Sequence, residues 1–120
     1  MKTNTRGYKD LLVWQKALAL AKIIYRITRN FPVAETFGLI TQMRRAAVSI
    51  PSNIIEGDTT GELIQGISHA EGSVAELDMQ LVLSIELMFL RKEEAQIAFE
   101  SIEEVRRILN VLRRKLSKRG

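Results

Sequence analysis

The sequence predicts an all-α protein, an antiparallel up-down-up-down bundle of four helices, and three observations support this. Apolar residues recur at steps of three and four along most of the chain, which is the period of an amphipathic helix. No segment shows the strict alternation of apolar and polar residues that indicates a half-buried strand. The breaks are short, so consecutive helices should pack as antiparallel neighbours. We expect one domain over residues 1–120, with helices near 10–30, 36–57, 62–90 and 92–118.

The first helix is expected to begin at Asp10, which can cap it, and to end before Pro32. A proline forces the preceding residue out of the helical region, so Phe31 should lie at the boundary. One face of the segment is apolar and should point into the bundle. It comprises Val13, Ala17, Leu20, Ala21, Ile24, Ile27 and Phe31.

The second helix is expected to start at a Thr36 cap and to end at Gly57, because glycine readily adopts the left-handed conformation that follows a helix. Its apolar face comprises Leu39, Met43, Ala46, Ile50 and Ile54. Pro51 lies inside this pattern, where a proline removes a backbone donor and costs about 3 kcal/mol. We therefore expect local compensation, in which Asn53 binds the carbonyl that Pro51 leaves free.

The third and fourth helices carry regular apolar repeats. Asp58–Gly61 is predicted to be a turn, with Thr60 as a candidate cap for the third helix. The core face of that helix comprises Ile67, Ala70, Val74, Leu77, Leu81, Ile85 and Met88. After a break at Arg91–Lys92, the core face of the fourth comprises Ala98, Ile102, Val105, Leu109, Leu112 and Leu116. These spacings predict knobs-into-holes packing near a +20° crossing angle.

Two glycines interrupt the third helix. Gly66 and Gly72 each cost about 1 kcal/mol relative to alanine in a helix interior. They lie among other small side chains, so a second helix can approach this surface closely. We expect Ala46–Ala47 of the second helix to lie against it.

The composition argues against several classes of function. The chain has no cysteine, which excludes disulfides and thiolate zinc sites. His69 is the only histidine, so neither a metal site in the bundle core nor a Ser-His-Asp set can be assembled convincingly. No lysine follows the glycines in the spacing of a phosphate loop. We expect a non-enzymatic protein with no catalytic residues, metal, cofactor or small-molecule substrate. Without an apolar leader or a membrane-spanning run, we expect it in the cytoplasm.

Charge is distributed unevenly along the chain. Residues 1–57 hold nine basic residues against three acids, and residues 58–104 hold two against eleven. From residue 105 to the end there are seven basic residues and no acid. Such asymmetry favours an anionic partner or complementary contacts between subunits. Alternatively, neighbouring helices neutralise one another within the chain.

Basic residues outside the core face of the fourth helix are the main candidates for nucleic-acid binding. Arg106 and Arg113 are seven residues apart, as are Arg107 and Arg114, so they lie along one side of the helix. Such cations contact phosphates without reading sequence. The expected nucleic-acid contacts are Arg44, Arg106, Arg107, Arg113, Arg114, Lys115 and Lys118. A second basic face on the first helix comprises Lys16, Lys22, Arg26 and Arg29.

The second helix also carries polar residues at helical steps. We interpret Arg45, Ser49, Asn53 and Glu56 as a structural polar network, in which Arg45 pairs with Glu56 or with an acid of the third helix. The alternative is that Arg45 presents its guanidinium to a phosphate. Arg44 points away from both the core face and this polar stripe.

Two apolar patches exceed what one core requires. They comprise Val48, Pro51 and Ile55 of the second helix and Leu83, Leu87 and Leu90 of the third. A monomer would expose them, so we expect an oligomer interface here. Alternatively the N-terminal arm covers them, with Tyr8, Leu11 and Leu12 as the covering side chains.

The stretch Gln42–Gly57 (QMRRAAVSIPSNIIEG) resembles the signature of the 23S rRNA intervening-sequence protein family. Further matching segments are Leu11–Ala17, Phe31–Pro32, Phe37–Leu39 and Glu71–Leu77. The resemblance implies an antiparallel four-helix bundle that assembles into a cyclic homopentamer. The family is similar to the accessory variability proteins of diversity-generating retroelements, which implies binding to RNA or DNA and to a reverse transcriptase through basic surfaces.

Two functions follow as hypotheses. The first is a homo-oligomeric bundle, as a pentamer, that binds RNA or DNA without sequence specificity, in the setting of a reverse transcriptase or of an rRNA-associated element. The alternative is a protein-interaction scaffold, in which the acidic third helix meets basic helices of neighbouring or partner subunits.

Overall fold

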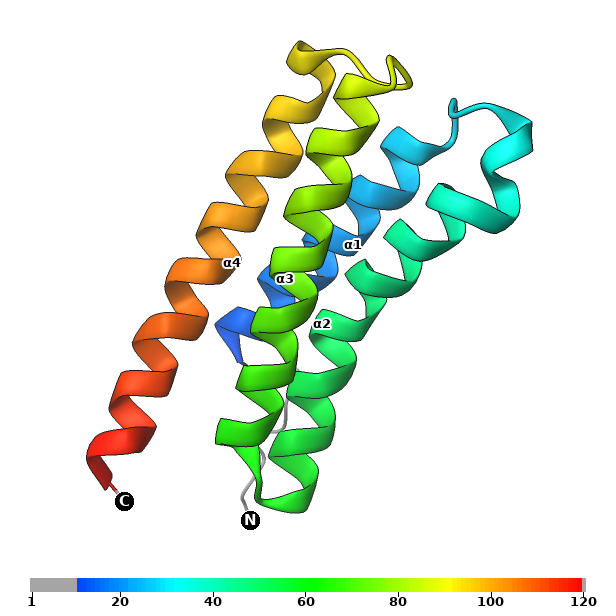
Figure 1. The fold of residues 1–120 in the computed structure, drawn as a ribbon. Coiled ribbons are helices and arrows are strands. Elements are labelled where there is room, and N and C mark those ends of the chain that lie inside the picture. Colours follow the sequence, from blue (N-terminus) through cyan, green and yellow to red (C-terminus); the bar gives the residue numbers. More distant parts are fainter. Residues whose placement is uncertain (1–10, 120) are drawn as a thin grey trace.

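The computed structural model describes residues 11–119, and it confirms the predicted all-α bundle. The long helices are α1 (Leu12–Thr28), α2 (Thr41–Thr60), α3 (Leu63–Glu86) and α4 (Lys92–Arg119), and they run alternately up and down (Figure 1). Helices α1 and α3 each pack against both α2 and α4. Every long helix therefore has two antiparallel neighbours, and the described chain contains no strand.

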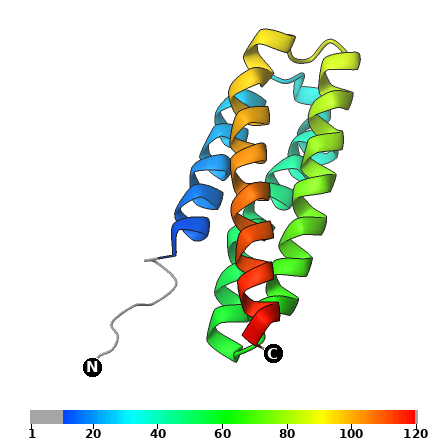
Figure 2. The same ribbon diagram turned by 90° about the vertical axis from the view of Figure 1, so that its left-hand side faces the viewer.

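The core consists of the apolar faces that the sequence predicts. The predicted core residues that are buried are Val13, Ala17, Leu20, Ala21, Ile24, Phe31, Leu39, Met43, Ala46, Ile50, Ile54, Ile67, Ala70, Val74, Leu77, Leu81, Ala98, Ile102, Val105 and Leu109. The prediction that Met88 lies in the core is wrong, since the residue is 89% exposed. Leu112 and Leu116 are only half-buried. The last turns of α4 extend past the beginning of α1, so they have less of the bundle to pack against (Figure 2).

The connection between α1 and α2 is longer than predicted. Helix α1 ends at Thr28, and a 3₁₀ turn (Val33–Glu35) and a distorted turn (Thr36–Ile40) precede α2. Thr36 therefore does not cap α2, and its hydroxyl donates to the Val33 carbonyl at 2.6 Å. The Glu35 carboxylate instead accepts from the Leu39 amide at 3.3 Å. The predicted cap of α1, Asp10, lies outside the described residues.

Helix α2 continues one turn beyond its predicted end. Gly61, with φ of 80°, is the left-handed residue that terminates it, and the amides of Gly61 and Glu62 both donate to the Gly57 carbonyl. Thr60 does not cap α3, because its hydroxyl donates to the Glu56 carbonyl within α2 at 2.9 Å. Gly57 is thus an interior residue of α2 and is buried.

The buried face of Gly57 lies against Gly66 of α3. A Cβ on Gly66 would lie 2.5 Å from the Asn53 carbonyl oxygen, and one on Gly57 would lie 2.9 Å from the Glu62 carbonyl oxygen. These neighbours are backbone atoms, so no side-chain rotation relieves the overlap. The close approach therefore involves Gly57 and Asn53 rather than the predicted Ala46–Ala47 pair. Gly72 faces open space.

Helix α2 continues through Pro51, whose side chain is buried in the chain's own core. The predicted compensation is wrong in its partner. The Asn53 side-chain amide donates to the Ser49 carbonyl at 2.7 Å. The carbonyl that would have accepted from a residue at position 51 belongs to Ala47, four residues before the proline.

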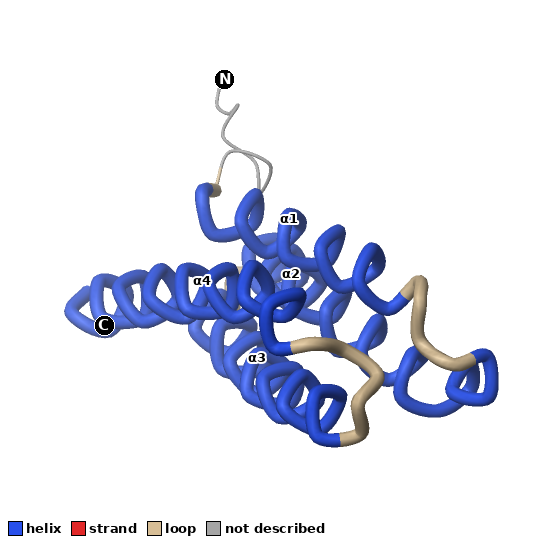
Figure 3. The backbone as a smooth tube through the Cα atoms, turned by 90° about the horizontal axis from the view of Figure 1, so that it is seen from above, coloured by secondary structure: helices blue, strands red, loops and turns tan. Residues whose placement is uncertain are grey.

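Helix α3 ends at Glu86, four residues before its predicted end. Met88, with φ of 65°, occupies the left-handed position, and the Phe89 amide donates to the Ser84 carbonyl while the Met88 amide donates to that of Ile85. This is a Schellman motif with methionine where glycine is usual. The Phe89 ring packs on Phe31 with centroids 5.7 Å apart, so the α1–α2 and α3–α4 connections meet at one end of the bundle (Figure 3).

Replacing Met88 with glycine should stabilise the protein by about 0.5–1 kcal/mol, because a left-handed backbone strains a side chain bearing a Cβ. Little packing is lost, since the side chain is exposed. Urea unfolding followed by circular dichroism measures the change. An equal or lower unfolding midpoint would contradict the strain.

Helix α4 begins at Lys92, as predicted. The Arg91 amide donates to the Glu94 carboxylate at 2.9 Å, and this bond lowers the pKa of Glu94. At pH values above the ordinary pKa of a glutamate, the ionised carboxylate caps the helix and stabilises the folded protein. This contribution to stability is lost as the pH falls through the lowered pKa of Glu94.

Candidate nucleic-acid interface

Two of the predicted phosphate-binding arginines are engaged with α3. The Arg113 guanidinium binds the Glu71 carboxylate, with Nη2 2.7 Å from Oε1, and donates to the Ser68 hydroxyl at 2.6 Å. Arg106 lies 3.5 Å from the Asp78 carboxylate and also binds Glu103. The two acids on α3 are seven residues apart, as are the two arginines on α4. Because the helices are antiparallel, the earlier arginine pairs with the later acid and the later arginine with the earlier acid. Local neutralisation therefore applies to this side of α4.

Among the described residues, the remaining cations of the predicted set on α4 have no such partner. Arg107, Arg114, Lys115 and Lys118 are exposed, and within residues 11–119 no ion pair involves any of them. On α1, by contrast, Lys16 pairs with Glu104 at 3.1 Å. The four exposed cations, which we call the α4 cationic strip, occupy the half of the helix that leads to its C-terminus.

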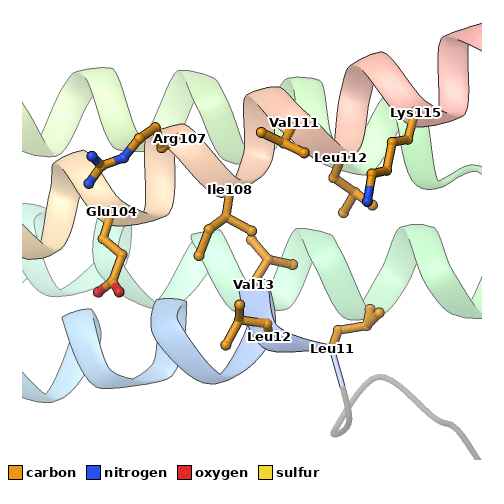
Figure 4. Close-up of a pocket in the computed structure, with 9 residues that line it drawn as sticks. All are labelled: Leu11, Leu12, Val13, Glu104, Arg107, Ile108, Val111, Leu112 and Lys115. Atoms are coloured by element: carbon orange, nitrogen blue, oxygen red, sulfur yellow. The ribbon is translucent and has the colours of Figure 1, made fainter.

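The α4 cationic strip borders an apolar groove of about 580 Å³ between α4 and the start of α1 (Figure 4). Its walls are Leu11, Leu12 and Val13 on one side and Ile108, Val111 and Leu112 on the other. Arg107 and Glu104 lie towards one end and Lys115 towards the other. The groove arises where α4 extends past α1.

Arg44, which the sequence places away from the core face and the polar stripe of α2, contacts α1. Its Nε donates to the Thr28 hydroxyl at 2.9 Å, and its Nη2 donates to the Tyr25 carbonyl at 3.3 Å. Its guanidinium carbon lies 4.5 Å from the centroid of the Tyr25 ring. The Tyr25 carbonyl is in the last turn of α1, where carbonyls lack partners within the helix. Arg44 therefore caps the C-terminus of α1 from α2 and complements its dipole.

Only part of the predicted polar network exists. The Ser49 hydroxyl contacts the Ser73 hydroxyl of α3 and donates to the Ala46 carbonyl at 2.8 Å. Asn53 joins this group through the Ser49 carbonyl. Arg45 and Glu56 are exposed. In the described part of the chain, no hydrogen bond or ion pair links their side chains to this polar group. The missed member is Ser73.

The predicted oligomer-interface residues divide into exposed and buried ones. Val48, Leu83 and Leu87 are exposed, and Ile55 is half-buried. Pro51 and Leu90 are buried within the single chain, so the prediction that they form part of an exposed apolar patch is wrong. Among the covering residues considered, Leu12 is exposed, whereas Tyr8 lies outside the described residues.

The exposed apolar surface of α3 is larger than the sequence predicts, because it includes Met79 and Val82. Exposed apolar side chains at steps of three, one and four lie on its side away from the core; they are Met79, Val82, Leu83 and Leu87. We call them the α3 outer face. Val48 belongs elsewhere, because it lines hollows with residues of α1.

Other kinds of site find no support in the described chain. Within residues 11–119, no three His, Asp or Glu side chains converge so as to hold a metal ion. His69 is exposed and lies in a shallow hollow beside Gln65. None of the described helices combines the length and the apolar character that a membrane span requires.

The family model for the 23S rRNA-intervening sequence protein matches residues 9–111, which include all of the bundle except the last turns of α4. The chain belongs to this family. A crystal structure from Bacteroides thetaiotaomicron, described as a protein with unknown function from the S23 ribosomal protein family, has the same fold at 22% identity. It covers 85% of this chain and 98% of its own, with a TM-score of 0.74. No curated protein matches. The matched residues include most of the lining of the α4 groove. Of the α4 cationic strip they include Arg107, whereas Arg114, Lys115 and Lys118 lie beyond residue 111.

Proposed function

We propose that this protein is a cytoplasmic, non-enzymatic homo-oligomer that binds the backbone of RNA or DNA without sequence specificity. The observation that carries the proposal is the α4 cationic strip, whose members form no ion pair with the carboxylates of residues 11–119, while their neighbours Arg106 and Arg113 do. When such cations neutralise phosphates, the counterions condensed on the nucleic acid are released into solution, which favours binding at low salt. The family's name connects such proteins with an intervening sequence of 23S rRNA.

The proposal includes self-association through the α3 outer face. These apolar side chains are exposed in one chain and lie on the side of α3 away from the core. Contiguous exposed apolar surface favours a protein interface. We propose the homopentamer that the resemblance implies. Sedimentation equilibrium of the purified protein should give the mass of five chains of 13.6 kDa, and a monomer at micromolar concentration would contradict it.

The binding part of the proposal is tested by a salt titration of the wild-type protein with unrelated RNA and DNA sequences. We expect affinities that depend little on sequence. The logarithm of the binding constant should fall with the logarithm of salt by about 0.9 for each phosphate contacted on a duplex and about 0.7 on a single strand. Absence of binding to every probe at about 50 mM salt would overturn the proposal.

The apolar groove favours a second candidate function, a scaffold for a protein partner. Its walls are leucine, isoleucine and valine side chains, which suit an apolar segment of a protein better than a phosphate backbone. In the retroelement setting the partner would be a reverse transcriptase. Co-purification with a reverse transcriptase, without binding to any nucleic acid alone, would favour this candidate.

A further inference from the structure

The guanidinium of Arg44 is held in a fixed orientation. Its Nε–H and one N–H of Nη2 are occupied by the Thr28 hydroxyl and the Tyr25 carbonyl, and its central carbon lies 4.5 Å from the centroid of the Tyr25 ring. A guanidinium has five N–H groups, so the rest stay available to an external acceptor. The side chain also lines a surface hollow of about 380 Å³ with Thr41 and Val48. Little side-chain entropy remains to be lost when an anion binds there.

The surroundings of Arg44 are positively charged. A second hollow of about 460 Å³ shares Tyr25 and Val48 with the first. The cations that line the two hollows are Lys22, Arg26, Arg29, Arg44 and Arg45. Glu35 is the only acid in residues 18–48, and its carboxylate accepts from the Leu39 amide. No carboxylate of residues 11–119 forms an ion pair with these five cations.

We propose that Arg44 forms a preorganised phosphate-binding site on the α1–α2 face, with a nucleic-acid backbone continuing over Arg45 and the cations of α1. The guanidinium fork matches two oxygens of one phosphate, and the flanking cations serve neighbouring phosphates. A phosphodiester chain is the ligand because its charges repeat at short intervals, as these cations do. The site rests on the proposed function and adds a second surface to the α4 cationic strip. Tyr25 lies about 20 Å along α1 from Leu12, which borders the α4 groove.

The test compares Arg44→Gln with Lys92→Gln in the full chain. Both remove one positive charge, but Lys92 begins α4 and lines neither hollow. Using a short oligothymidine as the probe, Arg44→Gln should weaken binding about tenfold and lower the salt slope by about 0.7. Lys92→Gln should change affinity less than about twofold. Arg44→Lys should remain weak, because an ammonium ion lacks the planar fork.

Two measurements distinguish a binding role from a structural one. Circular dichroism and sedimentation of Arg44→Gln check that the bundle and its assembly persist. If that variant fails to fold, Thr28→Val provides the second test, because it keeps Arg44 and the net charge but removes the acceptor of Nε, and it should weaken binding about threefold by lost preorganisation. In the wild-type protein, the Arg44 Nε–H resonance should shift when oligothymidine is added.

The outcomes separate this site from the proposed function. If the wild-type protein binds, and Arg44→Gln and Lys92→Gln lose the same affinity while the Arg44 resonance stays unmoved, the α1–α2 site is overturned and nucleic-acid binding stands. If the wild-type protein binds no oligonucleotide, both are overturned.

Discussion

Replacing Gly66 with alanine should destabilise the bundle by about 3 kcal/mol, because overpacking a tight contact costs about 1–3 kcal/mol and this contact cannot adjust through side chains. The new Cβ would lie 2.5 Å from the Asn53 carbonyl oxygen. Helices α2 and α3 would have to separate along their whole contact. Urea unfolding monitored by circular dichroism measures the loss, and a large shift of the midpoint to lower urea is expected.

Gly72→Ala is the matched control for this prediction. The two glycines share α3, but a Cβ on Gly72 meets no atom within 4 Å. The change should therefore stabilise the protein by about 0.5–1 kcal/mol through helix propensity. Opposite signs for the two substitutions would establish the close approach at Gly66. If Gly66→Ala were also stabilising, the helices would not be in contact there.

Replacing all four members of the α4 cationic strip with glutamine should reduce nucleic-acid affinity by on the order of 100-fold at low salt and lower the salt slope by about 3 on single strands. These side chains are exposed and form no ion pair with any carboxylate of residues 11–119, so the fold should be kept. Glutamine also has a helix propensity close to that of arginine and lysine. Fluorescence anisotropy across a salt series measures both quantities.

Arg106→Gln with Arg113→Gln is the corresponding control. These arginines bind Asp78 and Glu71 of α3, so the double variant should lose about 1 kcal/mol of stability. Its affinity for nucleic acid should fall much less than that of the four-residue variant. If the double variant lost binding while the strip variant kept it, the assignment of the interface would be reversed.

The helix faces and the pairing of α3 with α4 could be predicted from the sequence. Steps of three and four define the core because burial in a bundle selects one stripe of each helix. The partners of Arg106 and Arg113 were also within reach. Glu71 and Asp78 have the same seven-residue spacing, and antiparallel packing aligns two such pairs. The spacing of acids on one helix, combined with the spacing of arginines on the next, therefore indicates both ion pairs.

The helix ends were not predictable from local pattern. By residue type, either Gly57 or Gly61 could end α2. The helix ends at Gly61 because Gly57 lies inside α2, where it packs against the backbone of Gly66 with no room for a Cβ. Met88 is similar, because an apolar run predicts a continuing helix and contains no signal for a left-handed residue.

The contacts of Arg44 depend on tertiary structure in the same way. Its partners Thr28 and Tyr25 lie 16 and 19 residues earlier in the sequence. They meet it only because the irregular α1–α2 connection sets the two helices in one register. Sequence periodicity gives the face on which an arginine lies, but it does not give this register.

The extension of α4 past the beginning of α1 also has a dynamic consequence. Backbone hydrogen bonds in these last turns are supported by half-buried rather than buried side chains, so they can open locally without unfolding of the bundle. Part of the α4 cationic strip lies on this segment. A bound polyanion would therefore order a fraying helix end and would incur an entropic cost that weakens equilibrium affinity. The same freedom lets the strip adjust to backbones of different curvature, which suits a protein that binds nucleic acid without selecting a sequence.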